Sequence, residues 1–206
     1  MMSNFLDDIY DILFRPSQGM EKISKKKNIW HGFLVYTVVS LIVSLANTAN
    51  QTGQLLEEFQ ELSVPIELIQ GMSRFMPFFN LPFIPLYFFL SAAVLHLTAE
   101  LLGGEGRVSR LGAVLGYGQI PYIFMVPISL ITRYLPIDPT NLFSLIIFIW
   151  ALVLKVFGIQ AVYGFSSGKS LVTYFLPIII LTALLVLFMI FLAVIMAPFL
   201  GEFFQY

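Results

Sequence analysis

Residues 171–199, LVTYFLPIIILTALLVLFMIFLAVIMAPF, lie within the longest stretch of this sequence that has no charged side chain. A helix needs about 20 apolar residues to cross the hydrocarbon of a bilayer. This stretch exceeds that length, so it predicts a membrane-spanning helix that tilts or extends into the interface. The remainder of the chain repeats the same pattern at shorter lengths.

Four more apolar stretches lie upstream, at about 30–49, 81–102, 111–134 and 141–163. Together with the last stretch they predict an all-α integral membrane protein, a bundle of about five transmembrane helices. The prolines at 77, 82 and 85 crowd the start of the second stretch, and those at 121 and 127 lie inside the third. Neighbouring helices tolerate such prolines, so we expect kinks. The alternative is four spans, with one of these two stretches re-entrant.

The composition supports this class. Hydrophobic residues make up 58% of the 206 and charged residues 11%, whereas soluble domains carry about 25% charged residues. We expect a cytoplasmic amphipathic segment at 1–29 and one polytopic membrane domain at 30–206. The net charge of −1 gives no basis for a nucleic-acid partner. The absence of cysteine excludes disulfides, thiolate catalysis, zinc-thiolate sites and iron–sulfur clusters.

The lysines and arginines predict the orientation, because they accumulate in cytoplasmic loops. One side of the five-span arrangement holds eight of them: Arg15, Lys22, Lys25, Lys26, Lys27, Arg107, Arg110 and Lys169. The other side holds only Arg74 and Arg133. We therefore expect the N-terminus inside and the C-terminus outside.

Two segments outside the spans show helical amphipathic spacing and predict short interfacial helices. The first sets Phe5, Ile9, Ile12 and Leu13 apart from Asp7, Asp8 and Asp11; the second sets Leu55, Leu56, Phe59 and Leu62 beside Glu57, Glu58 and Glu61. Acidic faces bind anionic lipid poorly, so packing against the bundle is favoured over lying on the membrane. The run Lys25–Lys27 is interpreted as a topology signal, with head-group contact as the alternative.

Ionisable residues inside spans are costly and mark candidate sites. His96 and Glu100 lie four apart on one helix face near the inner end of span two. Lys155 lies in the inner half of span four, and span three contributes Tyr117 and Gln119 at a similar depth. These five residues predict a polar or ligand site in the cytoplasmic half of the bundle.

Three interpretations of that site remain open. The favoured one is structural, an ion pair between Glu100 and Lys155 that fixes helix packing. The second is a proton- or ion-handling site, because a carboxylate beside a histidine can titrate near neutral pH. The third is a metal site at His96 and Glu100, for which two ligands are too few. Lys155 could also snorkel to the interface without a partner.

Catalytic patterns are missing from the sequence. The turn Gly103–Gly106 follows a membrane helix and lacks the strand–turn–helix context of a nucleotide-binding loop. Gly116-Tyr117-Gly118 lies in an apolar stretch, where small residues favour close helix packing. No hydrolase motif is recognisable. The sequence predicts no enzyme, no cofactor and no metal centre.

The order of the short motifs resembles the prokaryotic branch of the Yip family, the Ypt-interacting proteins. The motifs are LFRP at 13–16, HLTAELLGGEG at 96–106, GAVLGYGQIP at 112–121, Trp150 with Lys155 and Gly158, and YGFSSGKS at 163–170. The resemblance covers about residues 11–185 and implies five spans with the N-terminus in the cytoplasm. The matching positions are Glu100, Gly103, Gly104, Tyr117, Pro121 and Lys169.

The resemblance does not carry over the whole function of the family. Eukaryotic members have a long cytoplasmic region and act with Rab-type GTPases, whereas only about 30 residues precede the first span here. We expect a non-enzymatic module in the prokaryotic cytoplasmic membrane that organises membrane or binds protein or lipid. Its expected partners are the bilayer, itself or other membrane proteins. The alternative is a small transporter or channel with His96, Glu100 and Lys155 lining a cavity.

Overall fold

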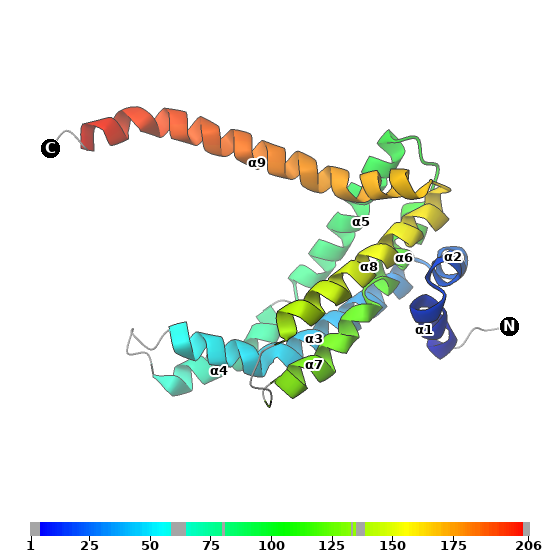
Figure 1. Ribbon diagram of the computed structural model, residues 1–206, viewed down its shortest axis with the longest axis horizontal. Coiled ribbons are helices and arrows are strands. Elements are labelled where there is room, and N and C mark those ends of the chain that lie inside the picture. The colour runs from blue at the N-terminus through cyan, green and yellow to red at the C-terminus, as the bar shows by residue number, and fades with distance from the viewer. Residues whose placement is uncertain (1–4, 59–64, 80, 133, 135–138, 204–206) are drawn as a thin grey trace.

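The computed structural model describes residues 5–58, 65–79, 81–132, 134 and 139–203, and every element in these ranges is a helix (Figure 1). In chain order they are α1 (Phe5–Phe14), α2 (Pro16–Lys26), α3 (Ile29–Glu58), α4 (Ile66–Phe79), α5 (Phe83–Leu101), α6 (Val108–Tyr117), the 3₁₀ helix η2 (Ile120–Phe124), α7 (Met125–Thr132), α8 (Thr140–Tyr163) and α9 (Ser167–Phe203).

Five helical segments are long and apolar enough to cross a membrane. They are Ile29–Asn47, Phe83–Leu101, Val108–Thr132, Thr140–Tyr163 and Ser167–Met196, which confirms the five predicted spans. Helix α3 continues beyond the predicted end of span one to Glu58. The expected stripe of Leu55, Leu56, Phe59 and Leu62 lies outside the residues whose side chains the structure describes. The described helix between spans one and two is instead α4.

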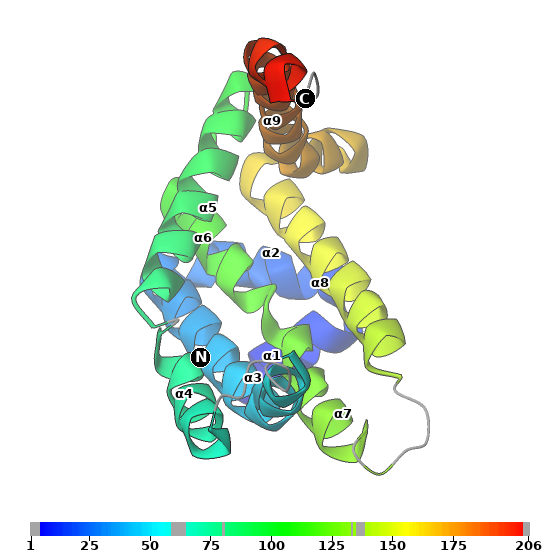
Figure 2. The same cartoon turned by 90° about the vertical axis from the view of Figure 1, so that its left-hand side faces the viewer.

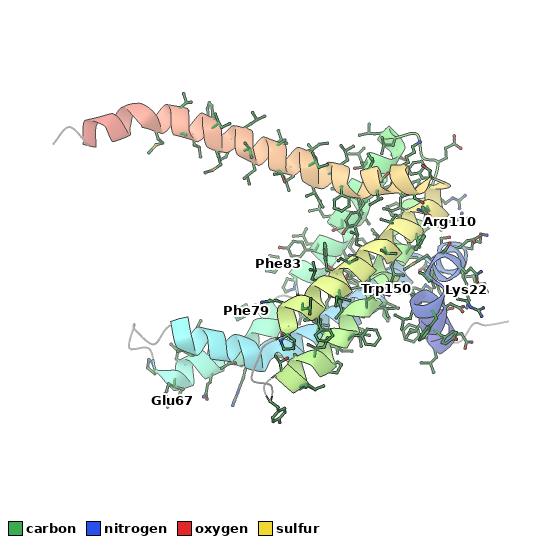
Figure 3. All side chains as sticks on the ribbon, viewed as in Figure 1. Lys22, Glu67, Phe79, Phe83, Arg110 and Trp150 are labelled. Atoms are coloured by element: carbon green, nitrogen blue, oxygen red, sulfur yellow. The ribbon has the colours of Figure 1, made fainter. Side chains whose placement is uncertain are left out.

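The third span is interrupted at its middle. Helix α6 ends at Tyr117, and the 3₁₀ helix η2 leads from Ile120 into α7. Pro121 has no N–H, so the carbonyl of Tyr117 cannot receive the usual i→i−4 hydrogen bond. The predicted kink is confirmed. A second proline break separates α4 from α5, where Phe79 and Phe83 lie on either side of the turn (Figure 3).

Glycines bring α3 and α6 together at the centre of the bundle. A Cβ on Gly116 would overlap the carbonyl group of Gly32, and a Cβ on Gly112 would lie 2.5 Å from Cγ1 of Ile29. The two backbones are therefore in direct contact, which only a residue without a side chain permits. The close packing expected around Gly116-Tyr117-Gly118 is confirmed on the Gly116 side.

Helices α1 and α2 form a hairpin that runs crosswise at the end of the bundle where α3 begins and α8 ends (Figures 1 and 2). Their crossing is tight, because a Cβ on Gly19 would lie 2.7 Å from the backbone of Ile12. Ile12, Met20 and Ile23 are fully buried in the same core as Leu111. The apolar side of the predicted N-terminal helix thus packs against the bundle, as expected.

Helix α9 diverges from the other spans beyond its first turns, as both views show (Figures 1 and 2). Ser170 and Thr173 are buried near its start, against α5 and α8. From Ile178 to Met196 every side chain is exposed. Because all of these side chains except that of Thr182 are apolar, acyl chains cover this surface in a bilayer.

Candidate functional site

The five polar residues predicted to form one cluster lie in three separate places. His96 and Glu100 lie near the C-terminal end of α5, where His96 contacts Tyr163 at the end of α8. Tyr117 faces the N-terminal hairpin, and Lys155 and Gln119 line a cavity. The expected ion pair between Glu100 and Lys155 does not occur in the described part of the chain. Glu100 pairs with its own helix neighbour instead.

The first group is centred on Tyr163. Nδ1 of His96 is 2.6 Å from the Tyr163 hydroxyl oxygen, and its Nε2 is 3.4 Å from Oε1 of Glu100. A neutral His96 with its proton on Nε2 directs that proton at Glu100 and accepts the hydroxyl proton of Tyr163 at Nδ1. The Glu100 side chain is 56% exposed, and the hydrogen bond between His96 and Tyr163 ties α5 to the end of α8.

The glycine turn between α5 and α6 packs on the same aromatic group. Gly103 has a φ of 79°, a left-handed conformation that favours glycine. A Cβ on Gly104 would lie 2.7 Å from the rings of both Phe165 and Tyr163. Lys169 lies 4.3 Å above the centre of the Phe165 ring. The motif positions Gly103, Gly104 and Lys169 therefore join two turns of the chain.

The second group is an ion-pair cluster beneath the N-terminal hairpin. Asp8 is 1% exposed, and its carboxylate lies 3.1 Å from the ammonium of Lys22 and 2.9 Å from that of Lys27. Lys22 also donates to Asp11 at 2.6 Å. Burial of Asp8 corrects the sequence-based view, in which the aspartates formed only the polar side of an amphipathic helix.

These carboxylates hold the charged form of both lysines. The hydrogen bond to Asp11 raises the pKa of Lys22, and the hydrogen bond to Asp8 raises the pKa of Lys27. The buried Tyr117 hydroxyl also lies beside Lys27. Tyr117 is thus part of the contact between span three and the hairpin. Figure 3 shows Lys22 at the same end of the molecule as Arg110, with Glu67 at the opposite end.

The third group lines a cavity of about 310 Å³ bounded by all five spans. Its polar lining consists of Tyr36 from α3, Ser91 from α5, Gln119 and Tyr122 from the break in span three, Lys155 from α8 and Tyr174 from α9. Phe88, Leu95 and Leu115 form part of its apolar wall. Its volume is within the usual range of small-molecule pockets, about 300–1,000 Å³.

Among the described residues that line this cavity, Lys155 is the only charged one. Among the described residues, its ammonium makes no ion pair and no hydrogen bond. The break in span three makes room for its stem, since a Cβ on Gly118 would lie 3.0 Å from Cγ of Lys155. The break in the third span beside Pro121 therefore makes room for the Lys155 side chain inside the bundle.

The mouth of the cavity lies between α5 and α9. The lining residues Ser91, Val94 and Ile178 are exposed, whereas Phe88, Leu95 and Leu115 are buried behind them. Ser91 lies at the middle of α5, which runs from Phe83 to Leu101. A cavity entered at that depth opens sideways toward the acyl chains of a bilayer.

Sequence reasoning identified Lys155 and Gln119 but missed the hydroxyl groups around them. Tyr36, Ser91, Tyr122 and Tyr174 lie on four different elements and carry no charge, so nothing in their local sequence distinguishes them from other span residues. Tyr163 was missed for the same reason. No group of three or more histidine, aspartate or glutamate side chains within the described ranges is placed to hold a metal ion.

Comparison with known families identifies one match. Residues 10–201 match the sequence profile of the Yip1 domain, which covers the N-terminal hairpin from Tyr10 and all five spans. No curated protein and no solved structure matches the chain.

Proposed function

The chain belongs to the Yip1 domain family, and on that premise we propose that it is a non-enzymatic membrane module that holds a lipid among its spans. The observation that carries this proposal is the cavity at mid-depth, whose mouth lies between α5 and α9. An amphipathic molecule can enter there from the bilayer without passing through water.

The proposal includes a location and an orientation. The motif order supports membership of the prokaryotic branch and therefore a cytoplasmic membrane. The excess of lysine and arginine around α2 and the α5–α6 turn supports an N-terminus inside and a C-terminus outside. The N-terminal hairpin then lies on the cytoplasmic side.

Transport through a shared polar site is less well supported. That alternative needs His96, Glu100 and Lys155 to line one cavity. Only Lys155 does so, because His96 contacts Tyr163 and Glu100 contacts His96 instead.

A photocrosslinking experiment tests the proposal. The protein is reconstituted in vesicles whose phospholipid carries a diazirine in its acyl chain, and labelled residues are mapped by mass spectrometry. Leu115 is the diagnostic position, because it lines the cavity and is only 6% exposed. We expect label at Leu115 in the wild-type protein.

Two tryptophan substitutions on α5 provide a matched pair. Ser91→Trp fills the mouth and should abolish the label at Leu115. Ala93→Trp places the same ring on another exposed position of α5 that does not line the cavity, and should leave the label unchanged. Absence of label at Leu115 in the wild type, or equal label in both variants, would refute a lipid in this cavity.

A further inference from the structure

We infer that Lys155 binds the acidic group of an anionic amphiphile, a carboxylate or a phosphate, whose apolar chain leaves the cavity between α5 and α9. This inference rests on the proposed function and names the class of ligand. It begins with the charge of the cavity, whose described lining contains a lysine and no aspartate or glutamate.

An ammonium inside a membrane protein is costly unless an opposite charge or several acceptors surround it. Elsewhere in this protein the chain supplies the opposite charge, since Asp8 neutralises Lys27 at 2.9 Å. At Lys155 it supplies none within the described residues. The missing negative charge is therefore the property that a ligand of this cavity must have.

The other polar groups of the cavity suit the same ligand. Tyr36, Tyr122, Tyr174, Ser91 and Gln119 all carry hydrogen-bond donors, and no hydrogen bond within the described part of the chain involves their side chains. An ammonium surrounded by hydroxyl and amide donors matches the several acceptor sites of a carboxylate or phosphate. A cationic ligand would face Lys155, and none of the described lining residues has a carboxylate to hold it.

Lys155 lies too far from the end of its helix for its side chain to reach water at the membrane surface. Lys155 lies eight residues before the end of α8 at Tyr163, about 12 Å along the helix axis at 1.5 Å per residue. Its stem runs past Gly118 into the cavity rather than along the outer face of the bundle.

The size and opening of the cavity indicate that the ligand also has an apolar chain. Its volume of about 310 Å³ lies at the low end of ligand pockets and accommodates an acidic head with the first part of a chain. The exposed lining residues Val94 and Ile178 at the mouth are apolar. The rest of the acyl chain then lies along α9, whose exposed side chains from Ile178 to Met196 are apolar apart from Thr182.

Native mass spectrometry of the full-length protein tests the inference. The protein is released from neutral-detergent micelles that contain equal amounts of oleate, 1-oleoyl lysophosphatidate and oleyl alcohol, and the mass of the adduct identifies the bound species. We expect an adduct of one or both acids and none of the alcohol. Oleate alone indicates a carboxylate ligand, and lysophosphatidate alone a phosphate ligand; either supports the inference.

Substitutions distinguish the contribution of the Lys155 charge to binding from that of the cavity as a whole. Lys155→Met should lower the occupancy of the acid about tenfold or more, because hydrogen bonds to charged groups contribute about 1.5–3 kcal/mol. Lys155→Arg should retain the acid. Lys26→Met, which removes an exposed lysine outside the cavity, should match the wild type. Equal binding of the alcohol and the acids, or unchanged acid binding in Lys155→Met, would overturn the inference.

The failure of the inference is distinguishable from that of the proposed function. If oleyl alcohol binds as well as the acids and Ser91→Trp removes all adducts, a lipid occupies the cavity but Lys155 does not select it. If Ser91→Trp leaves every adduct in place, the cavity is not the binding site and both proposals fail. Should Lys155→Met not fold, heat stabilisation of the wild type by the acids but not by the alcohol supports the inference, and equal stabilisation overturns it.

Discussion

Lys27 and Lys155 are both partly buried by the bundle, yet the chain neutralises only one of them. Lys27 lies 2.9 Å from a buried aspartate and beside the Tyr117 hydroxyl. Lys155 lies in a cavity lined by hydroxyl groups and an amide, with no carboxylate among the described residues of that lining. The two environments lie on either side of the end of α6. Its last residue, Tyr117, faces Lys27, and the next residue, Gly118, faces Lys155.

The contrast distinguishes a structural charge from one available to a ligand. Where the protein supplies both charges of an ion pair, removing either one leaves the other buried without an opposite charge. Such a removal therefore destabilises the fold. Where the protein supplies only one charge, removing that charge ends the cost of burying it unpaired. The removal then weakens the binding of a ligand and does not weaken the fold. The two lysines should therefore respond in opposite directions to the loss of charge.

Asp8→Asn should have the largest effect. It leaves Lys22 and Lys27 beneath the hairpin without their shared carboxylate, and we expect a loss of about 3 kcal/mol of stability. The measurement is thermal unfolding in detergent, followed by the fluorescence of Trp30 and Trp150. Asp7→Asn removes the same charge from an exposed position one residue earlier and should be nearly neutral. Equal unfolding temperatures for the two variants would contradict a structural role for the Asp8 cluster.

Gly116→Ala should have the next largest effect. The added methyl group meets the backbone of Gly32, so α3 and α6 must separate next to the residues that divide the two lysine environments. Overpacking of this kind costs about 1–3 kcal/mol. The control is Gly168→Ala, whose Cβ meets nothing within 4 Å. Thermal unfolding of the two variants compares them directly, and an unaffected Gly116→Ala would show that the helices can move apart freely.

Lys155→Met should change stability in the other direction. In protein stripped of lipid we expect a gain of up to about 1 kcal/mol, because an apolar side chain of similar length replaces an unpaired charge. Lys26→Met should leave the unfolding temperature unchanged. A marked loss of stability in Lys155→Met would mean that the chain itself satisfies this lysine, which would remove the contrast with Lys27.

The pH dependence should be the smallest effect in the physiological range. The carboxylates of Asp8 and Asp11 raise the pKa of Lys27 and Lys22 in the folded protein. A raised pKa gives stability that is fully present below the unfolded value of about 10.4 and is lost as pH rises through the folded value. The unfolding temperature should therefore hold from pH 7 to about 9.5 with respect to this cluster.

Above about pH 9.5 the cluster of Asp8, Asp11, Lys22 and Lys27 should stop stabilising the fold, because its lysines lose their charge. Its contribution should disappear as the pH passes the raised folded pKa, and Asp8→Asn should show a smaller loss over the same interval. An equal alkaline loss in the variant would assign the effect to other groups.

The patterns in the sequence predicted the spans well because a span is a local property. About 20 apolar residues must cover the hydrocarbon wherever they occur, and Pro121 must break the hydrogen-bond ladder of its own helix. The family match and the kink in span three follow from such local features. The sequence also identified Lys155 and Gln119 as polar residues inside spans.

The partners of those residues were not local, and here the prediction failed. The sequence suggested Glu100 for Lys155 because both lie in inner halves of spans, but depth does not determine which way a side chain points. The tertiary structure places Glu100 beside His96, buries Asp8 against Lys27, and places four uncharged hydroxyl groups in the cavity with Lys155.

Composition and hydrophobic length alone determined that this protein is a bundle of five membrane helices. They could do so because the bilayer imposes the same length and polarity on every span. Only the packing of the helices decided which lysine is neutralised and which faces a cavity. That outcome depends on helix rotation and on contacts such as Gly32 with Gly116, which join residues far apart in the chain.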